Sequence, residues 1–185
     1  NAYATFWYNR IVDDVYTCFG KWGGKEYCPQ NFDLSFRGAV TLRSALACSL
    51  NVPAVKVLNS LAGLNDSIEK AKEMGISTLN NPSAFYGLSL VLGGGEATLL
   101  DMTSAYGVFA AQGYRMPPTG IVKITDSAGI TVYESKKTPQ KVLSTRSANM
   151  ISSILSDNNA RAPIFGYNSP LYFANYSNVA VKTGT

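Results

Sequence analysis

Val179-Ala180-Val181-Lys182-Thr183-Gly184-Thr185 is the stretch that most constrains the fold. The apolar run before Lys182 predicts a short β-strand over residues 178–182. Its edge would present the Lys182 ammonium and the hydroxyls of Thr183 and Thr185, groups that bond a carboxylate. Gly184 has no side chain, so an anionic peptide can approach the backbone there and lie beside the strand. A strand that ends in a solvated lysine and a turn glycine is the plainer alternative.

Ser49-Leu50-Asn51 lies far upstream, and Asn51 stands 131 residues (182 − 51) before Lys182. A helix is expected to begin after Thr41, whose hydroxyl can cap it, with Ser49 on its apolar face. Pro53 suits the first turn of a second helix, so Asn51 is expected to cap that helix. A bend at Asn51 would let Ser49 and Asn51 face one cleft, where a hydroxyl can relay a proton and an amide can hold a substrate backbone. An ordinary helix end is again the alternative, because Ser and Asn are common there.

The other apolar patterns predict a mixed α/β fold. Helices are expected over 65–74, 98–112 and 145–155, and a β-hairpin over 121–133 around Asp126-Ser127-Ala128-Gly129. Residues 1–37 are rich in aromatic and turn-forming residues and predict an irregular segment with short helical or extended pieces. Residues 38–185 form the expected core of a single domain.

The composition excludes several classes of function. Apolar residues make up 46% of the 185 residues and charged residues 15%, which describes a globular protein rather than a disordered one. The net charge of +4 is scattered along the chain without a basic stripe, so no nucleic-acid partner is expected. With no histidine and no Cys-x-x-Cys pair, no metal and no cofactor are expected. No apolar stretch has the length that crosses a bilayer.

The three cysteines leave two possibilities open. A Cys18–Cys28 disulfide could close a small loop in an oxidising compartment. Free buried thiols at Cys18, Cys28 and Cys48 are the alternative, and the sequence favours it.

From residue 38 to residue 185 the sequence resembles the transpeptidase domain of class A, bifunctional penicillin-binding proteins. The resemblance rests on four collinear blocks and includes the two motifs, Ser-x-Asn and Lys-Thr-Gly, that such serine acyltransferases carry. The blocks are 40–55, 92–96 with 101–106, 160–163 with 165–166, and 179–185. Cys48 departs from the family, which usually has a small polar residue at that position.

The resemblance implies a penicillin-binding transpeptidase fold and a peptidoglycan D,D-transpeptidase activity. In this family a serine of Ser-x-x-Lys attacks the D-Ala-D-Ala end of a stem peptide, and the acyl group passes to an amine of a neighbouring strand. β-Lactams imitate the substrate and trap the acyl-enzyme. The resemblance implies catalytic roles for Ser49, Asn51 and Lys182. It implies substrate binding by Thr183, Gly184 and Thr185.

The resemblance also implies where the protein works. The parent protein would be membrane-anchored, would carry a glycosyltransferase domain, and would act in the periplasm on the outer face of the bacterial cytoplasmic membrane. Its partners would be peptidoglycan stem peptides, with β-lactams as inhibitors.

The nucleophile is the main departure from the family pattern. The family places Ser-x-x-Lys well before Ser-x-Asn, whereas Ser67-Ile68-Glu69-Lys70 follows it and is interpreted as a capped surface helix. Ser147-Ala148-Asn149 and Ser156-Asp157-Asn158 stand close to Lys182, and we interpret them as chance matches. We therefore expect a partial domain, truncated at both ends, whose nucleophile lies outside the chain. The isolated piece is expected to be inactive.

Two further functions stay open. A D,D-carboxypeptidase or β-lactamase-like hydrolase would use the same chemistry with water as the acceptor, although the long interval from Asn51 to Lys182 and the hairpin over 121–133 favour a transpeptidase. A catalytically silent domain would only bind peptidoglycan or partner proteins.

Overall fold

The computed structural model of the protein describes residues 9–22, 24–136, 138–176 and 178–184. The chain forms two compact units. The first consists of residues 1–67, 81–95 and 150–185, and the second of residues 68–80 and 96–149. Both candidate motifs, Ser-x-Asn and Lys-Thr-Gly, therefore belong to the first unit.

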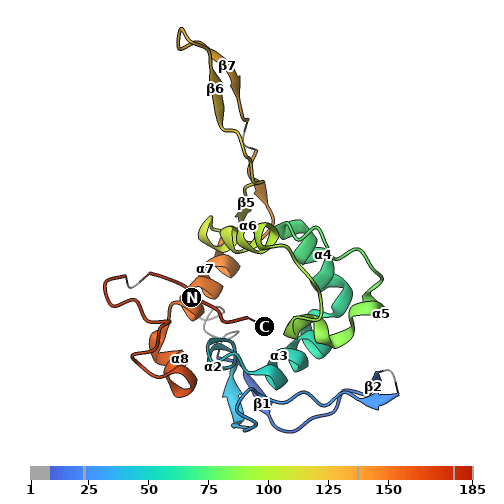
Figure 1. Ribbon diagram of the computed structural model, residues 1–185. Coiled ribbons are helices and arrows are strands. Elements are labelled where there is room, and N and C mark those ends of the chain that lie inside the picture. The colour runs from blue at the N-terminus through green and yellow to red at the C-terminus, as the bar shows by residue number, and fades with distance from the viewer. Residues whose placement is uncertain (1–8, 23, 137, 177, 185) are drawn as a thin grey trace. The chain divides into compact units, whose positions relative to one another are not determined.

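The first unit combines short strands with short helices (Figure 1). Its elements are β1 (Ile11–Asp14), β2 (Lys21–Trp22), β3 (Lys25–Glu26), β4 (Gly38–Thr41), α2 (Leu42–Ala47), α3 (Asn51–Val57), η1 (Leu58–Ala62), α5 (Ser83–Tyr86), η2 (Gly87–Leu92) and α8 (Asn158–Phe165). Two longer helices, α4 (Leu64–Met74) and α7 (Thr145–Leu155), each begin in one unit and end in the other.

An antiparallel pair of strands leads directly into the first of these helices. In β1 and β4, Ile11 lies opposite Thr41, and Asp14 lies opposite Gly38. Thr41 ends β4 and caps α2, because its hydroxyl oxygen accepts the N–H of Ser44 at 3.1 Å. The predicted cap is confirmed. Helix α3 packs beside β1, and α2 packs beside α8.

Buried apolar side chains from α2, α3 and their connection form the core of the first unit. They are Ala45, Cys48, Leu50, Val52, Val55 and Leu58. Val52 and Val55 have no exposed surface, and burial of such a side chain stabilises a fold by about 1.5–3 kcal/mol. The connection that carries Ser49 is therefore anchored in the core on both sides.

The strand expected over residues 178–182 does not form. Strands exist through hydrogen bonds to a neighbouring strand, and each sheet among the described residues has only two strands, none of them from this segment. The segment instead bonds to a helix end, where the N–H of Val181 donates to the carbonyl of Leu155 at 2.9 Å.

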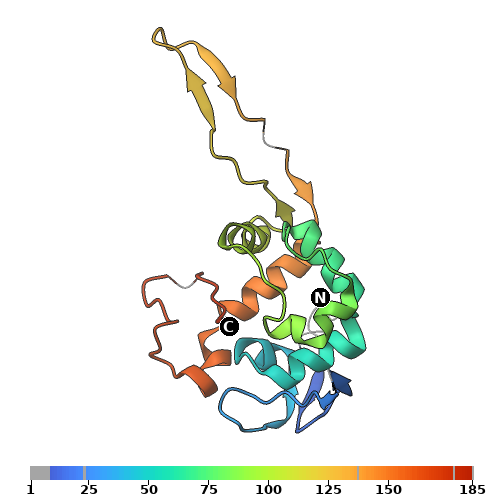
Figure 2. The ribbon, with the colours of Figure 1, turned by 45° about the vertical axis from the view of Figure 1, so that its right-hand side comes forward.

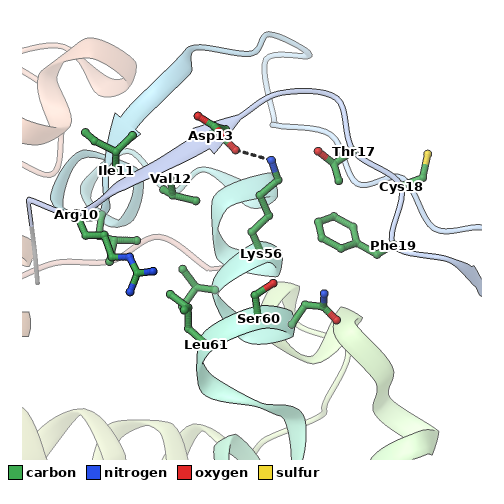
Figure 3. Close-up of a pocket in the computed structure, with 13 residues that line it drawn as sticks. Arg10, Ile11, Val12, Asp13, Thr17, Cys18, Phe19, Lys56, Ser60 and Leu61 are labelled. Carbon is green, nitrogen blue, oxygen red and sulfur yellow. Dashed lines mark hydrogen bonds between the residues drawn. The ribbon is translucent and has the colours of Figure 1, made fainter.

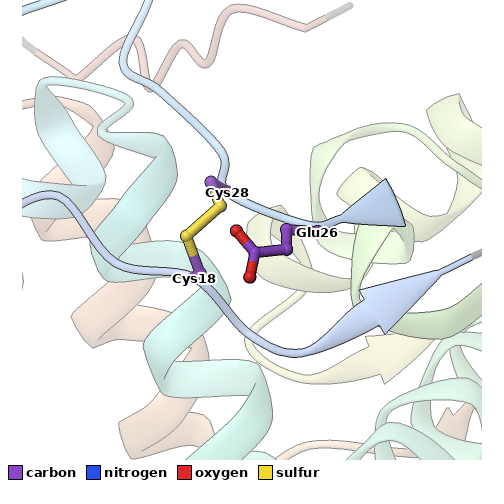
Figure 4. A group of neighbouring side chains, drawn as sticks. All are labelled: Cys18, Glu26 and Cys28. Atoms are coloured by element: carbon purple, nitrogen blue, oxygen red, sulfur yellow. A yellow bond between two sulfur atoms is a disulfide. The ribbon is translucent and has the colours of Figure 1, made fainter. Parts of the chain in front are cut away.

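The prediction of free thiols is wrong for two of the three cysteines. Cys18 and Cys28 form a disulfide across a separation of 10 residues, while Cys48 is free and buried. The bond closes the loop that contains the β2–β3 hairpin, and the carboxylate of Glu26 lies beside it (Figure 4). Sequence spacing could not decide this pairing, because it depends on how the chain folds between the two positions.

Three short helices were not expected from the sequence. Helix α5 and the 3₁₀ helix η2 occupy residues 83–92, and α8 follows α7 after one break. Asp157 makes that break, because its carboxylate caps α8 by accepting the N–H of Ala160 at 2.9 Å. Ser156-Asp157-Asn158 thus begins a helix, which agrees with its interpretation as a chance match to the family motif.

The second unit contains α6 (Leu99–Ala110) and two strand pairs, β5 (Tyr114–Arg115) with β8 (Gln140–Lys141) and β6 (Lys123–Thr125) with β7 (Thr131–Glu134). Within this unit, β6 and β7 extend as a hairpin beyond β5 and β8 (Figure 2). Thr98 caps α6 by accepting the N–H of Asp101 at 3.0 Å. The predicted helix and hairpin are both confirmed.

Candidate active site

Ser49 and Lys182 meet directly in the first unit. The ammonium nitrogen of Lys182 donates to the hydroxyl oxygen of Ser49 at 2.6 Å and to the carbonyl oxygen of Thr183 at 2.8 Å. Both side chains are half-buried. The two polar motifs, 133 residues apart in sequence, therefore meet through one short charge-assisted hydrogen bond.

The backbone presents Ser49 in an unusual conformation. Helix α2 ends at Ala47, and Ser49 has a φ of 56°, in the left-handed region that residues with a Cβ rarely adopt. The N–H of Ser49 donates to the carbonyl of Leu46, and the N–H of Leu50 donates to that of Ala45. The chain thus breaks at Ser49 rather than bending at Asn51. The break lets Leu50 enter the core while the Ser49 hydroxyl reaches Lys182.

Lys182 is placed by the end of α7 and by a buried arginine. Its neighbour Val181 bonds to the carbonyl of Leu155, the last residue of α7. Arg161, which is only 4% exposed, donates to the same carbonyl at 2.6 Å and also to the carbonyl of Leu171 at 3.4 Å. The segment that carries Lys182 is therefore fixed through main-chain acceptors.

The electrostatic environment of Lys182 favours loss of its proton. Burial lowers the pKa of Lys182 below the ordinary lysine value, because partial desolvation disfavours the charged ammonium. Among the described residues no carboxylate forms an ion pair with Lys182. A cation without a carboxylate partner, beside a serine hydroxyl, can attract an anionic group and can exchange a proton with that hydroxyl.

Asn51 is the first residue of α3 rather than its cap. The capping position falls on Leu50, whose side chain has no acceptor, so the expected cap at Asn51 is wrong. The N–H of Asn51 donates to Oδ1 of Asn31 at 2.8 Å, and its side-chain amide donates to the carbonyl of Gln30 at 2.8 Å. Asn51 thus bonds to residues 30 and 31 and, within the described chain, not to Lys182.

Asn31 and Asp14 form a buried polar pair behind Ser-x-Asn. Asn31 is 3% exposed and Asp14 is fully buried. The amide nitrogen of Asn31 donates to both carboxylate oxygens of Asp14, at 2.8 and 2.9 Å. Neither residue is predicted from the sequence, because both lie in the segment 1–37 whose composition predicts irregular structure. The sequence signal was weak: an apolar residue stands where α3 needs a polar cap, so the acceptor must come from elsewhere.

The two described residues after Lys182, Thr183 and Gly184, differ in their burial and in their contacts. Thr183 is half-buried and its carbonyl accepts from Lys182. Gly184 is exposed, and a Cβ added there would meet no described atom within 4 Å. Space beside Gly184 is therefore open to a ligand, as its predicted role requires. Thr185 lies outside the described residues.

The Ser67–Lys70 motif has its polar groups engaged elsewhere. The Ser67 hydroxyl donates at 2.6 Å to the carbonyl of Gly63, the residue before helix α4. Lys70 is exposed and pairs with Glu73, one turn further along the same helix. These contacts agree with a surface helix and differ from the direct hydroxyl–ammonium bond between Ser49 and Lys182.

A surface pocket of about 560 Å³ lies elsewhere in the first unit. It is lined by residues of β1, α2, α3 and η1 and does not include Ser49, Asn51 or Lys182. Lys56 crosses it and donates to the carbonyl of Asp13 at 2.8 Å (Figure 3).

Cys18, Glu26 and Cys28 lie close enough together to be considered as metal ligands. Both sulfurs are in the disulfide, so the group offers no thiolate to a metal in this state.

The chain matches known protein families over nearly its whole length. The family model for the penicillin binding protein transpeptidase domain matches residues 9–185. Penicillin-binding protein 1A of Clostridium acetobutylicum is 33% identical over 180 residues, which are 95% of this chain and 21% of that protein. Penicillin-binding protein 1A of Aquifex aeolicus is 39% identical over 120 residues, or 65% of this chain and 16% of that protein.

The fold agrees with these matches. The crystal structure of penicillin-binding protein 1A from Haemophilus influenzae superimposes with a TM-score of 0.71 at 23% identity, covering 85% of this chain and 28% of that one. This likeness confirms the predicted mixed α/β fold. The chain spans about a fifth of the length of the relatives named above. Because the family model matches residues 9–185, the chain belongs to the penicillin-binding protein transpeptidase domain family.

Proposed function

We propose that the chain is part of a peptidoglycan D,D-transpeptidase that cross-links stem peptides through an acyl-enzyme and is inhibited by β-lactams. The observation that carries this proposal is the 2.6 Å hydrogen bond between Lys182 and Ser49. It joins the two family motifs in one site and leaves the Lys182 charge without a carboxylate partner among the described residues. Because the chain belongs to the transpeptidase family, we assign the Ser49–Lys182 pair to that family's reaction.

Each residue of the pair has a distinct task in the proposed reaction. The attacking serine belongs to a Ser-x-x-Lys other than residues 67–70, because Ser67 bonds to the carbonyl of Gly63 while Lys70 bonds to Glu73 and to the carbonyl of Val142. When the bond from its oxygen to the acyl carbon forms, the scissile C–N bond breaks, and the lysine of that Ser-x-x-Lys can take the proton of the attacking serine. The leaving amine must gain a proton, which the Ser49 hydroxyl can give while Lys182 passes its own proton to Ser49. The lowered pKa of Lys182 makes that exchange easier.

Recognition of the substrate carboxylate is assigned to the end of the segment. Lys182 supplies the charge, Thr183 and Thr185 supply hydroxyls, and the open space beside Gly184 admits the peptide backbone. Asn51 is assigned to the substrate backbone, with its amide held by the carbonyl of Gln30 until a ligand replaces that acceptor.

We further propose that the protein containing this chain acts in the periplasm, anchored in the cytoplasmic membrane and joined to a glycosyltransferase domain. The relatives named penicillin-binding protein 1A support this proposal. None of the described helices has the length and apolarity needed to cross a bilayer. The disulfide agrees with an oxidising compartment.

Covalent labelling of the full-length protein with a fluorescent penicillin tests the function. We expect labelling of the wild type, and slowing by about 10²- to 10⁴-fold in Ser49→Ala and Lys182→Met, the range for loss of proton transfer. Ser67→Ala and Lys70→Met are the matched controls, because they alter the same residue types outside the site, and they should label normally. An unlabelled wild type, or loss of labelling in Ser67→Ala, contradicts the proposal. Product analysis with stem peptides then separates a transpeptidase from a hydrolase.

A further inference from the structure

Asn31 connects two parts of the first unit through a single side chain. Its Oδ1 accepts the N–H of Asn51 at 2.8 Å and lies 3.5 Å from the N–H of Val52. Its amide nitrogen donates to Asp14 and to the carbonyl of Ser35, the latter at 2.8 Å. Every polar atom of this buried side chain is therefore used, which fixes its position and its orientation.

Asp14 is the fixed end of this connection. It lies in β1 opposite Gly38 of β4, so the strand pairing sets where its backbone sits. Its carboxylate accepts two bonds from Asn31 and one from the N–H of Arg37 at 3.0 Å. A fully buried carboxylate needs such partners, because an unpaired charge is costly away from water. The Asp14–Asn31 pair is consequently a rigid support.

The Asp14–Asn31 pair bonds to the start of α3, next to the unfavourable backbone conformation of Ser49. Leu50 cannot cap α3, and the neighbouring Ser49 has a left-handed φ of 56° that is unfavourable for a residue with a Cβ. Hydrogen bonds to Leu46 and Ala45 hold this break on the α2 side. On the α3 side, the bond from the N–H of Asn51 to Asn31 holds it.

We propose that Asn31, anchored by Asp14, is a positioning residue that holds Ser49-Leu50-Asn51 in the geometry of the reaction. The inference rests on the proposed transpeptidase function. Asn31 acts through the Asn51 backbone rather than on the substrate, and Gln30 beside it holds the Asn51 side chain. A shift of the α3 N-terminus would move both polar groups of the motif relative to Lys182.

An exchange of the two side chains tests this positioning role. Asn31→Asp alone sets two carboxylates against each other at the position of the present 2.8 Å contact and removes the donor. In the double variant Asp14→Asn/Asn31→Asp, a new amide at position 14 faces a new carboxylate at position 31. That carboxylate still accepts the N–H of Asn51, and the new amide oxygen still accepts the N–H of Arg37. The exchange thus restores one amide–carboxylate bond with its polarity reversed, but it loses the bond to Ser35 and turns the new carboxylate toward that carbonyl.

The measurement is the acylation rate of the full-length protein with a fluorescent penicillin, well below each variant's melting temperature. We expect Asn31→Asp to slow acylation by about 10- to 100-fold, the cost of misplacing a reacting group by about 1 Å. The folded double variant should acylate faster than Asn31→Asp but more slowly than the wild type, because the Asn51 N–H regains a fixed acceptor while the Ser35 carbonyl loses its donor. Asn31→Ser, which removes the bonds without adding charge, serves if Asn31→Asp does not fold, with the same expected slowing.

A stability control separates positioning from simple folding. Val108→Ala creates a cavity at a fully buried residue of α6 in the second unit, so it should lower the melting temperature and leave acylation unchanged. The inference is overturned if folded Asn31 variants acylate at the wild-type rate, or if the folded double variant stays as slow as Asn31→Asp. A wild type that is never acylated overturns the proposed function itself, and with it this inference.

Discussion

Arg161 and Val181 donate to the same acceptor, the carbonyl oxygen of Leu155, at 2.6 and 2.9 Å. A buried guanidinium and the residue before Lys182 thus share one anchor at the end of α7. Arg161 also reaches the carbonyls of Asp157 and Leu171. The position of Lys182 therefore depends on a side chain that does not contact it.

Arg161→Met is expected to lower the free energy of unfolding by about 1–3 kcal/mol, because it removes the guanidinium hydrogen bonds to the carbonyls of Leu155, Asp157 and Leu171. Penicillin acylation should slow at the same time, since the segment that carries Lys182 loses part of its support. Urea denaturation and fluorescent-penicillin labelling measure the two effects. Arg146→Met is the matched control, because Arg146 is exposed in α7. An Arg161 variant that matches this control in both measurements contradicts the prediction.

The pH dependence of stability should report on Lys182. Burial lowers the pKa of Lys182 in the folded protein, so between that pKa and the unfolded value of about 10.4 the unfolded chain binds more protons. The Lys182 contribution to stability therefore increases as pH rises through this interval and is constant below it. Denaturation at several pH values, compared with Lys182→Met, isolates the contribution. Identical pH slopes for the two proteins would mean that Lys182 titrates as an exposed lysine.

Two substitutions at Ser49 separate the effect of its backbone conformation on stability from the effect of its hydroxyl on acylation. Ser49→Gly and Ser49→Ala both remove the hydroxyl that Lys182 contacts, so both should acylate slowly and equally. Only glycine relieves the left-handed backbone, and Ser49→Gly should be more stable than Ser49→Ala by roughly 1 kcal/mol. Equal free energies of unfolding for the two variants would show that the backbone moves away from φ 56° in solution.

Gly184 provides a test of ligand approach without a folding cost. A Cβ at Gly184 meets no described atom, so Gly184→Ala should melt at the wild-type temperature and still bind penicillin or stem peptide less tightly. Gly113→Ala is the contrasting control, because its Cβ would lie 2.3 Å from the carbonyl oxygen of Leu143 and should destabilise the protein. Unchanged affinity in Gly184→Ala would place the substrate elsewhere.

The Cys18–Cys28 disulfide should contribute about 2–4 kcal/mol to the stability of the first unit, mainly by restricting the unfolded chain. Cys18→Ser/Cys28→Ser should accordingly unfold at lower denaturant concentration than the wild type. Cys48→Ser is the control at the free thiol: it keeps the disulfide, so a reductant should lower its stability, whereas the same reductant should leave the stability of the double variant unchanged. A double variant as stable as the wild type would show that the loop is held by its other contacts.

Local rules explain which parts of the fold could be predicted. The caps at Thr41 and Thr98 and the hairpin turn at Asp126 follow from short-range hydrogen bonding, which the sequence contains in full. The meeting of Ser49 with Lys182 was also predictable, because two polar motifs with matching chemistry required one site.

The missed features depend on partners distant in sequence. The predicted strand over 178–182 has no neighbouring strand in the part of the chain that the structure describes, and no pattern within five residues reveals that. The cap of α3 comes from Asn31, 20 residues upstream of Asn51, so Asn51 was assigned a role that another residue fills. The state of Cys18 and Cys28 likewise depended on the path of the chain between them.

The buried carboxylate of Asp14 adds a residue of strand β1 to those that align the site. A genetic selection for bacteria that survive β-lactams should therefore recover changes at positions 14 and 31, in a region with no group at the reacting atoms. Such alleles would leave every ligand contact intact and alter only the alignment of the Ser-x-Asn turn. A search for resistance restricted to Ser49, Asn51 and Lys182 would miss changes at these two positions.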